Sequence, residues 1–282
     1  MCIRDRIYTY IRQELSGFYP DAEAAAMAKH ILTEKFQLSA LDLYAGKDMN
    51  FSSEKLSEVN DILERLKSYE PLQYIIGETW FCGFRFKVTL AVLIPRPETA
   101  ELIDWIVEDG KGEGKRVLDI GTGSGCIPVS LALMMDAPVV SAWDISEDAL
   151  AVAAANARMN NAYVTFGRVD VLGTEIPDIK VDIIVSNPPY ITESEKVDME
   201  KNVLEWEPDL ALFVPDNDPL RFYRRIAEIG LKILDDGGVI YFEINRAYGK
   251  ETVEMLCGMG YKDIELRKDL SGNDRMIKAL RP

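Results

Sequence analysis

The stretch LDIGTGSG, Leu118–Gly125, decides the fold. An apolar run precedes it and a helical pattern follows, which predicts a turn from a strand into a helix. Glycine at positions 121, 123 and 125 lets the backbone turn sharply and approach a ligand closely. The spacing is G-x-G-x-G, not the G-x-G-x-x-G of dinucleotide enzymes, and residues 121–130 contain no lysine or arginine. The loop therefore favours a ligand without phosphates, although glycine-rich turns also occur as structural corners.

Strands and helices alternate downstream of this loop. The strand candidates RVLDIG, VVSAWDI, VTFGRVD, VDIIVSN and GVIYFEI are typical of a doubly wound α/β sheet. The end of the chain differs, because KDIELRKDL, SGND and RMIKALR predict two more strands joined by a tight turn. A seven-stranded sheet that ends in such an antiparallel hairpin resembles the sheet of class I S-adenosylmethionine-dependent methyltransferases.

A ligand without phosphates on such a sheet points to S-adenosylmethionine. Asp144 ends the second strand, where a doubly wound fold places the carboxylate that binds ribose hydroxyls. Its alternative role is to cap the next helix, which Ser146 can do without it. Asp170 is a weaker candidate for the adenine edge, and Asp119 is expected near the methionine ammonium group. The predicted cofactor-binding residues are Gly121, Thr122, Gly123, Ser124, Gly125, Asp144, Asp170, Val171 and Asn187.

The fourth strand leads into DIIVSNPPYIT, residues 182–192, and should deliver Asn187-Pro188-Pro189-Tyr190 to the carboxyl edge of the sheet. The two prolines make this elbow stiff and poor in donors. The Asn187 side-chain oxygen and the Pro188 carbonyl can accept both hydrogens of a planar amino group and direct its lone pair at a methyl carbon. Tyr190 offers an apolar face for stacking. We predict Asn187, Pro188 and Tyr190 as catalytic; the alternative is a simple strand-ending turn.

Longer segments resemble the HemK-type protein-(glutamine-N5) methyltransferases that modify peptide chain release factors. The resemblance is carried by PLQYIIGETWFCGFRFKV, LIPRPETAELIDWI, DIGTGSG, SNPPYI, VLEWEPDLAL and DLSGNDR. It implies a substrate glutamine in the exposed Gly-Gly-Gln loop of a class I release factor. Residues 187–190 would hold this glutamine, with Arg96 and Glu98 of the IPRPET turn, 94–99, as orienting residues.

Two positions depart from the pattern of that family. Val171 stands where members often carry tryptophan, and Asn245 stands where glycine is frequent. We expect neither residue to touch the reacting centre.

The chain divides into three predicted parts. Residues 1–70 form a helical substrate-docking domain, 71–95 a β-hairpin linker, and 96–282 the methyltransferase domain. The helical part rests on three apolar stripes and on Ser52 or Ser53 as a helix cap after a turn at 46–50. The stripes are Ile7, Tyr10, Ile11 and Leu15, then Ala24, Ala28, Ile31 and Leu32, then Leu56, Val59, Ile62, Leu63 and Leu66.

Composition limits the function classes. The net charge of −15 disfavours a nucleic acid partner unless Arg221, Arg224, Arg225 and Lys232 form a local basic patch, and such a run is more often a solvated helix face. Four scattered cysteines and one histidine, His30, predict neither a disulfide nor a metal site and indicate a reducing cytoplasm. No apolar run is long enough for a membrane helix, and no signal peptide is expected.

Three other functions remain open from the residues. A ribosomal-protein glutamine methyltransferase shares much of this layout, although RPET at 96–99 favours the release-factor branch. An adenine-amino methyltransferase acting on nucleic acid is disfavoured by the acidic charge. A non-catalytic cofactor-binding scaffold would not require the elbow at 187–190.

Overall fold

The computed structural model describes residues 3–39, 51–110 and 112–282. The turn expected at 46–50 and Cys2 lie outside the described residues. The chain forms two compact units. The first comprises the chain up to Gly77 together with Glu200–Trp206, and the second comprises Glu78–Met199 and Glu207–Pro282.

The first unit is helical. Its elements are α1 (Ile3–Leu15), α2 (Asp21–His30), η1 (Ile31–Lys35), α4 (Ser53–Lys67), α5 (Leu72–Ile76) and α9 (Lys201–Leu204). Ser52 caps α4 by accepting a hydrogen bond from the Lys55 amide. The predicted stripes supply the apolar core, with two exceptions. Tyr10 and Leu56 are 36% and 40% exposed, because they lie at the edges of the stripes, and the Tyr10 hydroxyl donates to Asn60 instead.

A distant piece of chain completes this unit. The Trp206 indole Nε1 donates to the Ser68 carbonyl oxygen at 3.1 Å, and the Lys201 ammonium lies 4.9 Å from the centre of the Tyr69 ring. The helical unit is therefore built from two segments that are more than a hundred residues apart in the sequence.

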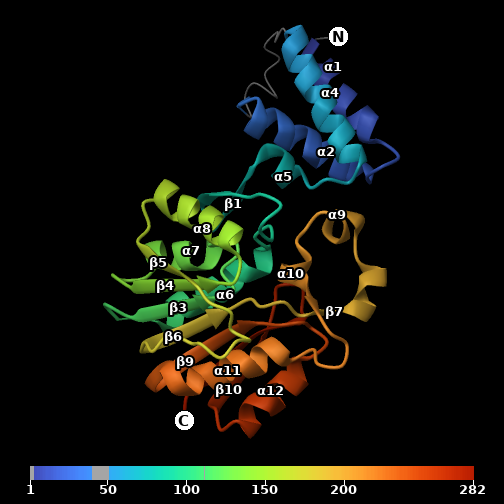
Figure 1. Cartoon of the computed structure of the whole chain (residues 1–282). Helices are drawn as coiled ribbons and strands as arrows, with labels where there is room; N and C mark the ends of the chain where they lie inside the picture. The colour runs from blue at the N-terminus through green and yellow to red at the C-terminus, as the bar shows by residue number, and fades with distance from the viewer. Residues whose placement is uncertain (1–2, 40–50, 111) are drawn as a thin grey trace. The chain divides into compact units, whose positions relative to one another are not determined.

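The second unit contains the seven-stranded sheet shown in Figure 1. The strand order is β10 (Lys262–Lys268), β11 (Asp274–Leu280), β9 (Leu234–Glu243), β6 (Val181–Ser186), β3 (Arg116–Ile120), β4 (Val139–Asp144) and β5 (Val164–Arg168). Strand β11 pairs antiparallel with both β9 and β10, and the remaining pairs are parallel. The predicted doubly wound sheet with its terminal hairpin is confirmed.

Helices cover both faces of this sheet. One face carries α6 (Pro97–Asp109), α7 (Cys126–Met134) and α8 (Glu147–Met159), and the other carries α11 (Arg221–Ile233) and α12 (Gly249–Gly258). Figure 1 shows α7 and α8 above the strands and α11 and α12 below them. Each face has its own apolar core, so the strands are buried on both sides.

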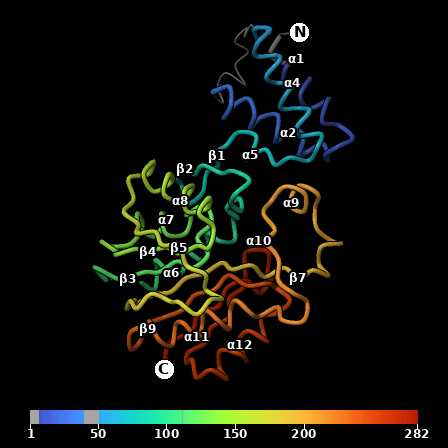
Figure 2. Tube along the Cα trace, in the orientation of Figure 1, coloured from blue at the N-terminus to red at the C-terminus, as the bar shows by residue number. Residues whose placement is uncertain are grey.

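Shorter elements extend from the sheet. They are the predicted hairpin, β1 (Glu78–Phe81) and β2 (Phe84–Lys87), and the group β7 (Ile191–Thr192), η2 (Glu193–Asp198), α10 (Asp209–Leu212) and β8 (Phe213–Val214). Figure 2 traces the chain from β6 to β7, which pairs in parallel with β8. The elbow at 187–190 thus lies between the end of a central strand and a small second sheet.

The glycine loop is fixed by close packing against α8. A Cβ atom on Gly125 would lie 2.9 Å from the Ala153 Cβ, and Gly125 has a φ of +78°, so only glycine suits this position. The buried Asn156 of α8 donates to the Ser124 carbonyl at 2.8 Å and to the Lys87 carbonyl at 3.0 Å. One side chain therefore joins the loop, the helix and the hairpin.

Candidate active site

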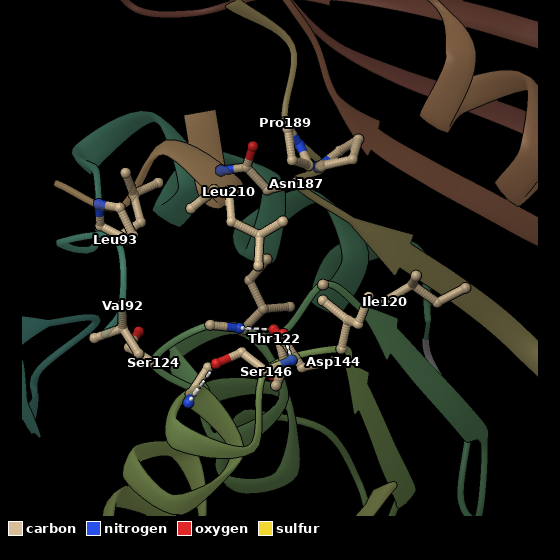
Figure 3. Close-up of a pocket in the computed structure, with 18 of the residues that line it drawn as sticks. Val92, Leu93, Ile120, Thr122, Ser124, Asp144, Ser146, Asn187, Pro189 and Leu210 are labelled. Atoms are coloured by element: carbon tan, nitrogen blue, oxygen red, sulfur yellow. Dashed lines mark hydrogen bonds between the residues drawn. The ribbon is translucent and has the colours of Figure 1, made fainter. Parts of the chain in front are cut away.

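A cavity of about 330 Å³ opens at the carboxyl ends of the central strands. The predicted site residues that line it are Arg96, Gly121, Thr122, Gly123, Ser124, Asp144, Asp170, Val171, Asn187, Pro188 and Pro189. Gly125, Glu98 and Tyr190, also predicted, are not among the lining residues. Figure 3 shows Asn187 and Pro189 across the cavity from Thr122 and Asp144. The structure thus brings the elbow and the glycine loop to one site.

Hydrogen bonds hold the glycine loop at its strand. The Gly121 and Thr122 amides donate to the Trp143 carbonyl at 2.8 and 3.0 Å. The Asp144 carboxylate accepts from the Gly123 amide at 2.8 Å and from the Ser146 amide at 2.9 Å, while the Ser146 hydroxyl caps α8. Since a carboxylate offers about four lone-pair sites, Asp144 retains capacity to accept from a ligand.

Asp119 lies buried beside this loop. Both of its carboxylate oxygens and the Thr122 hydroxyl are buried and lack a hydrogen-bond partner among the described residues. Burial raises the pKa of Asp119 to about 7; the neighbouring Thr122 hydroxyl opposes this shift, and the charge on Asp144 adds to it. An unpaired buried carboxylate is costly, and an ammonium group is the kind of partner it fits.

The loop after β5 forms another side of the cavity. Asp170 is exposed and accepts from the Leu172 amide at 2.9 Å. Arg225 of α11 donates to the Val171 and Gly173 carbonyls, each at 2.8 Å, so it holds this loop in place. Arg224 pairs with Asp218 at 3.1 Å. These two arginines of the suggested basic patch are therefore engaged within the protein.

The elbow is anchored by a buried carboxylate that the sequence did not assign to it. The Tyr190 hydroxyl donates to Glu243 Oε1 at 3.2 Å, and the Thr99 hydroxyl donates to Glu243 Oε2 at 2.6 Å. The Asn187 Nδ2 donates in turn to the Thr99 Oγ1 at 3.4 Å. Burial raises the pKa of Glu243, with the Thr99 bond opposing that shift, and burial likewise raises the pKa of Tyr190.

Asn245 also braces the elbow, although it is not among the residues that line the cavity. Its Nδ2 donates to the Tyr190 carbonyl at 3.0 Å and to the Glu195 carboxylate at 3.0 Å. The chain after β9 turns back toward the elbow, so this contact joins residues that are 55 positions apart in the sequence. Glycine at this position would have no side chain to make either bond.

Arg96 projects from the turn that precedes α6. Its guanidinium pairs with Glu207 Oε1 at 2.6 Å, and the Glu207 side chain is only 1% exposed. Burial raises the pKa of Glu207, and the charge of Arg96 opposes this shift. The pair holds Arg96 at the cavity wall, whereas Glu98 is half-buried outside the lining.

The described part of the chain contains no group of three or more His, Cys, Asp or Glu side chains that could hold a metal ion. None of the helices within residues 3–39, 51–110 and 112–282 is long and apolar enough to cross a membrane. Cys82, Cys126 and Cys257 are free thiols.

The strand order, the inserted antiparallel strand and a glycine loop without a basic residue together define a class I methyltransferase. A methyltransferase from Pyrococcus furiosus has the same fold, with a TM-score of 0.53 and 15% identity over 82% of this chain and 99% of that one. Residues 7–77 match the PrmC N-terminal domain, and residues 99–206 match the Methyltransferase small domain.

Relatives narrow the family further. A release factor glutamine methyltransferase of Bacteroides thetaiotaomicron is 52% identical over 278 residues, covering 98% of this chain and 100% of that protein. The one of Flavobacterium psychrophilum is 45% identical over 275 residues, 96% of each chain. The chain belongs to the release factor glutamine methyltransferases, and S-adenosylmethionine is its cofactor.

Proposed function

We infer that this enzyme methylates the side-chain nitrogen, N5, of the glutamine in the Gly-Gly-Gln loop of a class I peptide chain release factor. One observation carries this inference: a stiff elbow, whose Asn187 Oδ1 accepts no hydrogen bond from the described residues, faces the glycine loop across one cavity. The high identity to named release factor glutamine methyltransferases supports the choice of substrate.

The residues around the cavity fit S-adenosylmethionine. We assign the ribose hydroxyls to Asp144, the ammonium group to Asp119 and Thr122, and the adenine to the loop at Asp170 and Val171. The unpaired buried oxygens of Asp119 support this assignment, since they need a cationic donor. When bound, the cofactor supplies an electrophilic methyl group on a sulfonium.

The elbow prepares the target nitrogen. A carboxamide nitrogen is a poor nucleophile because its lone pair is delocalised into the carbonyl. Asn187 Oδ1 and the Pro188 carbonyl accept its two hydrogens, which favours pyramidal geometry and directs the lone pair at the methyl group. On transfer the methyl–sulfur bond would break to leave a neutral thioether, and the methylated nitrogen would then release its surplus proton to water, so the residues need not include a general base.

The helical unit and its added segment, 200–206, are proposed to dock the release factor. A translation factor as substrate places the reaction in the cytoplasm. Nucleic acid is not expected to be the substrate, since the chain carries a net charge of −15.

The function is tested by offering labelled S-adenosylmethionine with purified release factor, ribosomal protein and DNA. We expect label on the release factor alone, and on its Gly-Gly-Gln peptide after digestion. Label on the ribosomal protein or DNA, with none on the release factor, would refute the proposal.

Replacing Asp144 with alanine is expected to weaken cofactor binding about tenfold to hundredfold, through the loss of charge-assisted hydrogen bonds. Calorimetry with S-adenosylmethionine measures this loss of affinity. Asp144→Asn is the matched control, because it keeps one acceptor for the Gly123 amide. Equal affinity in the alanine variant would disprove the ribose assignment.

Cofactor affinity should depend on pH through Asp119. Below its pKa of about 7 the carboxyl is protonated and cannot pair with an ammonium group, so binding should weaken as pH falls from 8 to 6. Asp119→Asn should bind weakly and lose this dependence.

The stability of the cofactor-free protein should depend on pH in the opposite sense, because it should fall as the pH rises. The folded pKa of Asp119 exceeds its ordinary value of 3.8, so this group destabilises the fold as pH rises through that interval. Asp119→Asn should therefore raise the melting temperature at pH 8. A variant that melts lower and binds as tightly as the wild type would contradict both statements.

A further inference from the structure

The carboxamide of Asn187 can point either of two ways, which differ by the exchange of its oxygen and nitrogen. The proposed chemistry needs the oxygen toward the substrate, because a target amino group offers hydrogens and requires acceptors. Something in the protein must therefore choose between two side-chain orientations of nearly equal shape.

Hydrogen-bond directions make that choice. Glu243 and Thr99 are 1% and 2% exposed, so neither can turn to water for a partner. An ionised carboxylate only accepts, so the single hydrogen of the Thr99 hydroxyl is committed to Glu243 Oε2, 2.6 Å away. The Thr99 Oγ1 can then only accept from Asn187, which turns the Nδ2 toward it at 3.4 Å. The Oδ1, which accepts no hydrogen bond from the described residues, is left to accept from the substrate.

Glu243 is suited to stay an acceptor on both oxygens. Its Oε1 accepts from the Tyr190 hydroxyl at 3.2 Å, so one carboxylate reaches both ends of the elbow. Burial raises the pKa of Glu243, and three neighbours oppose this shift and favour the ionised form: the Thr99 hydroxyl, the guanidinium of Arg275 on β11 and the Tyr190 hydroxyl. Three elements, α6, β9 and the segment after β6, meet in this network.

We propose that Thr99 is a positioning residue that, through Glu243, holds the Asn187 carboxamide with its oxygen toward the methyl acceptor; this rests on the proposed function. Among the described residues, Thr99 is the one hydrogen-bond partner of the Asn187 side chain, so without its hydroxyl no hydrogen bond distinguishes the two orientations. The flipped amide would set its own N–H donors against those of the substrate.

The test compares Thr99→Val, which has the same shape without the hydroxyl, with Thr99→Ser, which keeps it. We expect Thr99→Val to lower kcat for release factor methylation about tenfold or more, while Thr99→Ser stays within about threefold of the wild type. The Kd for S-adenosylmethionine and the melting temperature should change little in either variant. Equal activity of Thr99→Val and the wild type, or equal losses in both variants, would overturn the proposal.

Glu243→Gln provides a second measurement, decisive if Thr99→Val does not fold. Glutamine keeps an acceptor for Tyr190, but its NH₂ group can donate to Thr99 and reverse the network, so kcat should fall by a similar factor. The double variant, Thr99→Val with Glu243→Gln, should have a kcat no lower than that of the slower single variant, because each variant disrupts the same hydrogen-bond network. Additive losses of kcat in the double variant would contradict a shared role of Thr99 and Glu243. A wild-type enzyme that leaves the release factor unlabelled would instead refute the proposed function itself.

Discussion

Replacing Asn187 with alanine is expected to slow methyl transfer by about 10²–10³, the scale for losing one preorganised hydrogen-bonding group at a transition state. The side chain lies on the cavity wall opposite the glycine loop, and its Oδ1 has no partner among the described residues. Its removal takes away one of two acceptors that pull the lone pair out of conjugation. The loss should appear in kcat more than in cofactor affinity.

Single-turnover methylation of the release factor measures the rate, and calorimetry measures the affinity for S-adenosylmethionine. Asn217→Ala is the matched control, since Asn217 is exposed and lies outside the cavity lining. Wild-type turnover in Asn187→Ala would remove this residue from the mechanism. A large loss of cofactor affinity with unchanged turnover at saturation would make Asn187 a cofactor ligand only.

The strands could be predicted because their signals are local. Apolar runs, the glycine loop and the SGND turn each mark an element within about ten residues. The start of β9 was predicted less well. It begins at Leu234 rather than Gly238, because Asp235, Asp236 and Gly237 have the composition of a turn but lie in an irregular extension opposite Val181.

The hydrogen-bond network of Thr99 and Glu243 could not be predicted from the sequence, because it joins residues that are far apart in the chain. Thr99 and Glu243 are 144 residues apart, and only the folded sheet brings the start of α6 to the end of β9. One signal was available: Glu243 is a charged residue within the apolar run GVIYFEI, and a buried carboxylate needs partners. The segment 200–206 gave no comparable signal, since its partners Ser68 and Tyr69 belong to the helical unit.

A release factor whose target glutamine is replaced with glutamate should accept no methyl group, with a rate at least about 10⁴-fold lower, the scale at which a hydrogen-bonding site rejects an analogue without the donor. Glutamate brings no N–H, so Asn187 Oδ1 and the Pro188 carbonyl would face a carboxylate with acceptors only. Arg96, the cation assigned to the cavity wall, is already paired with the buried Glu207 and is not available to compensate. Methyl transfer from labelled S-adenosylmethionine measures the loss.

Replacing the target glutamine with asparagine separates the effect of hydrogen bonding from the effect of side-chain length. It keeps the carboxamide and its two hydrogens but is shorter by one methylene, so the nitrogen stops about 1.5 Å short of the elbow. We expect slow but measurable labelling of the asparagine variant and none of the glutamate variant, because the first fails in distance and the second in hydrogen bonding. Label recovered as a methyl ester on the glutamate variant would mean that the elbow does not select its substrate by accepting two N–H bonds, and the roles of Asn187 and Pro188 would have to be reassigned.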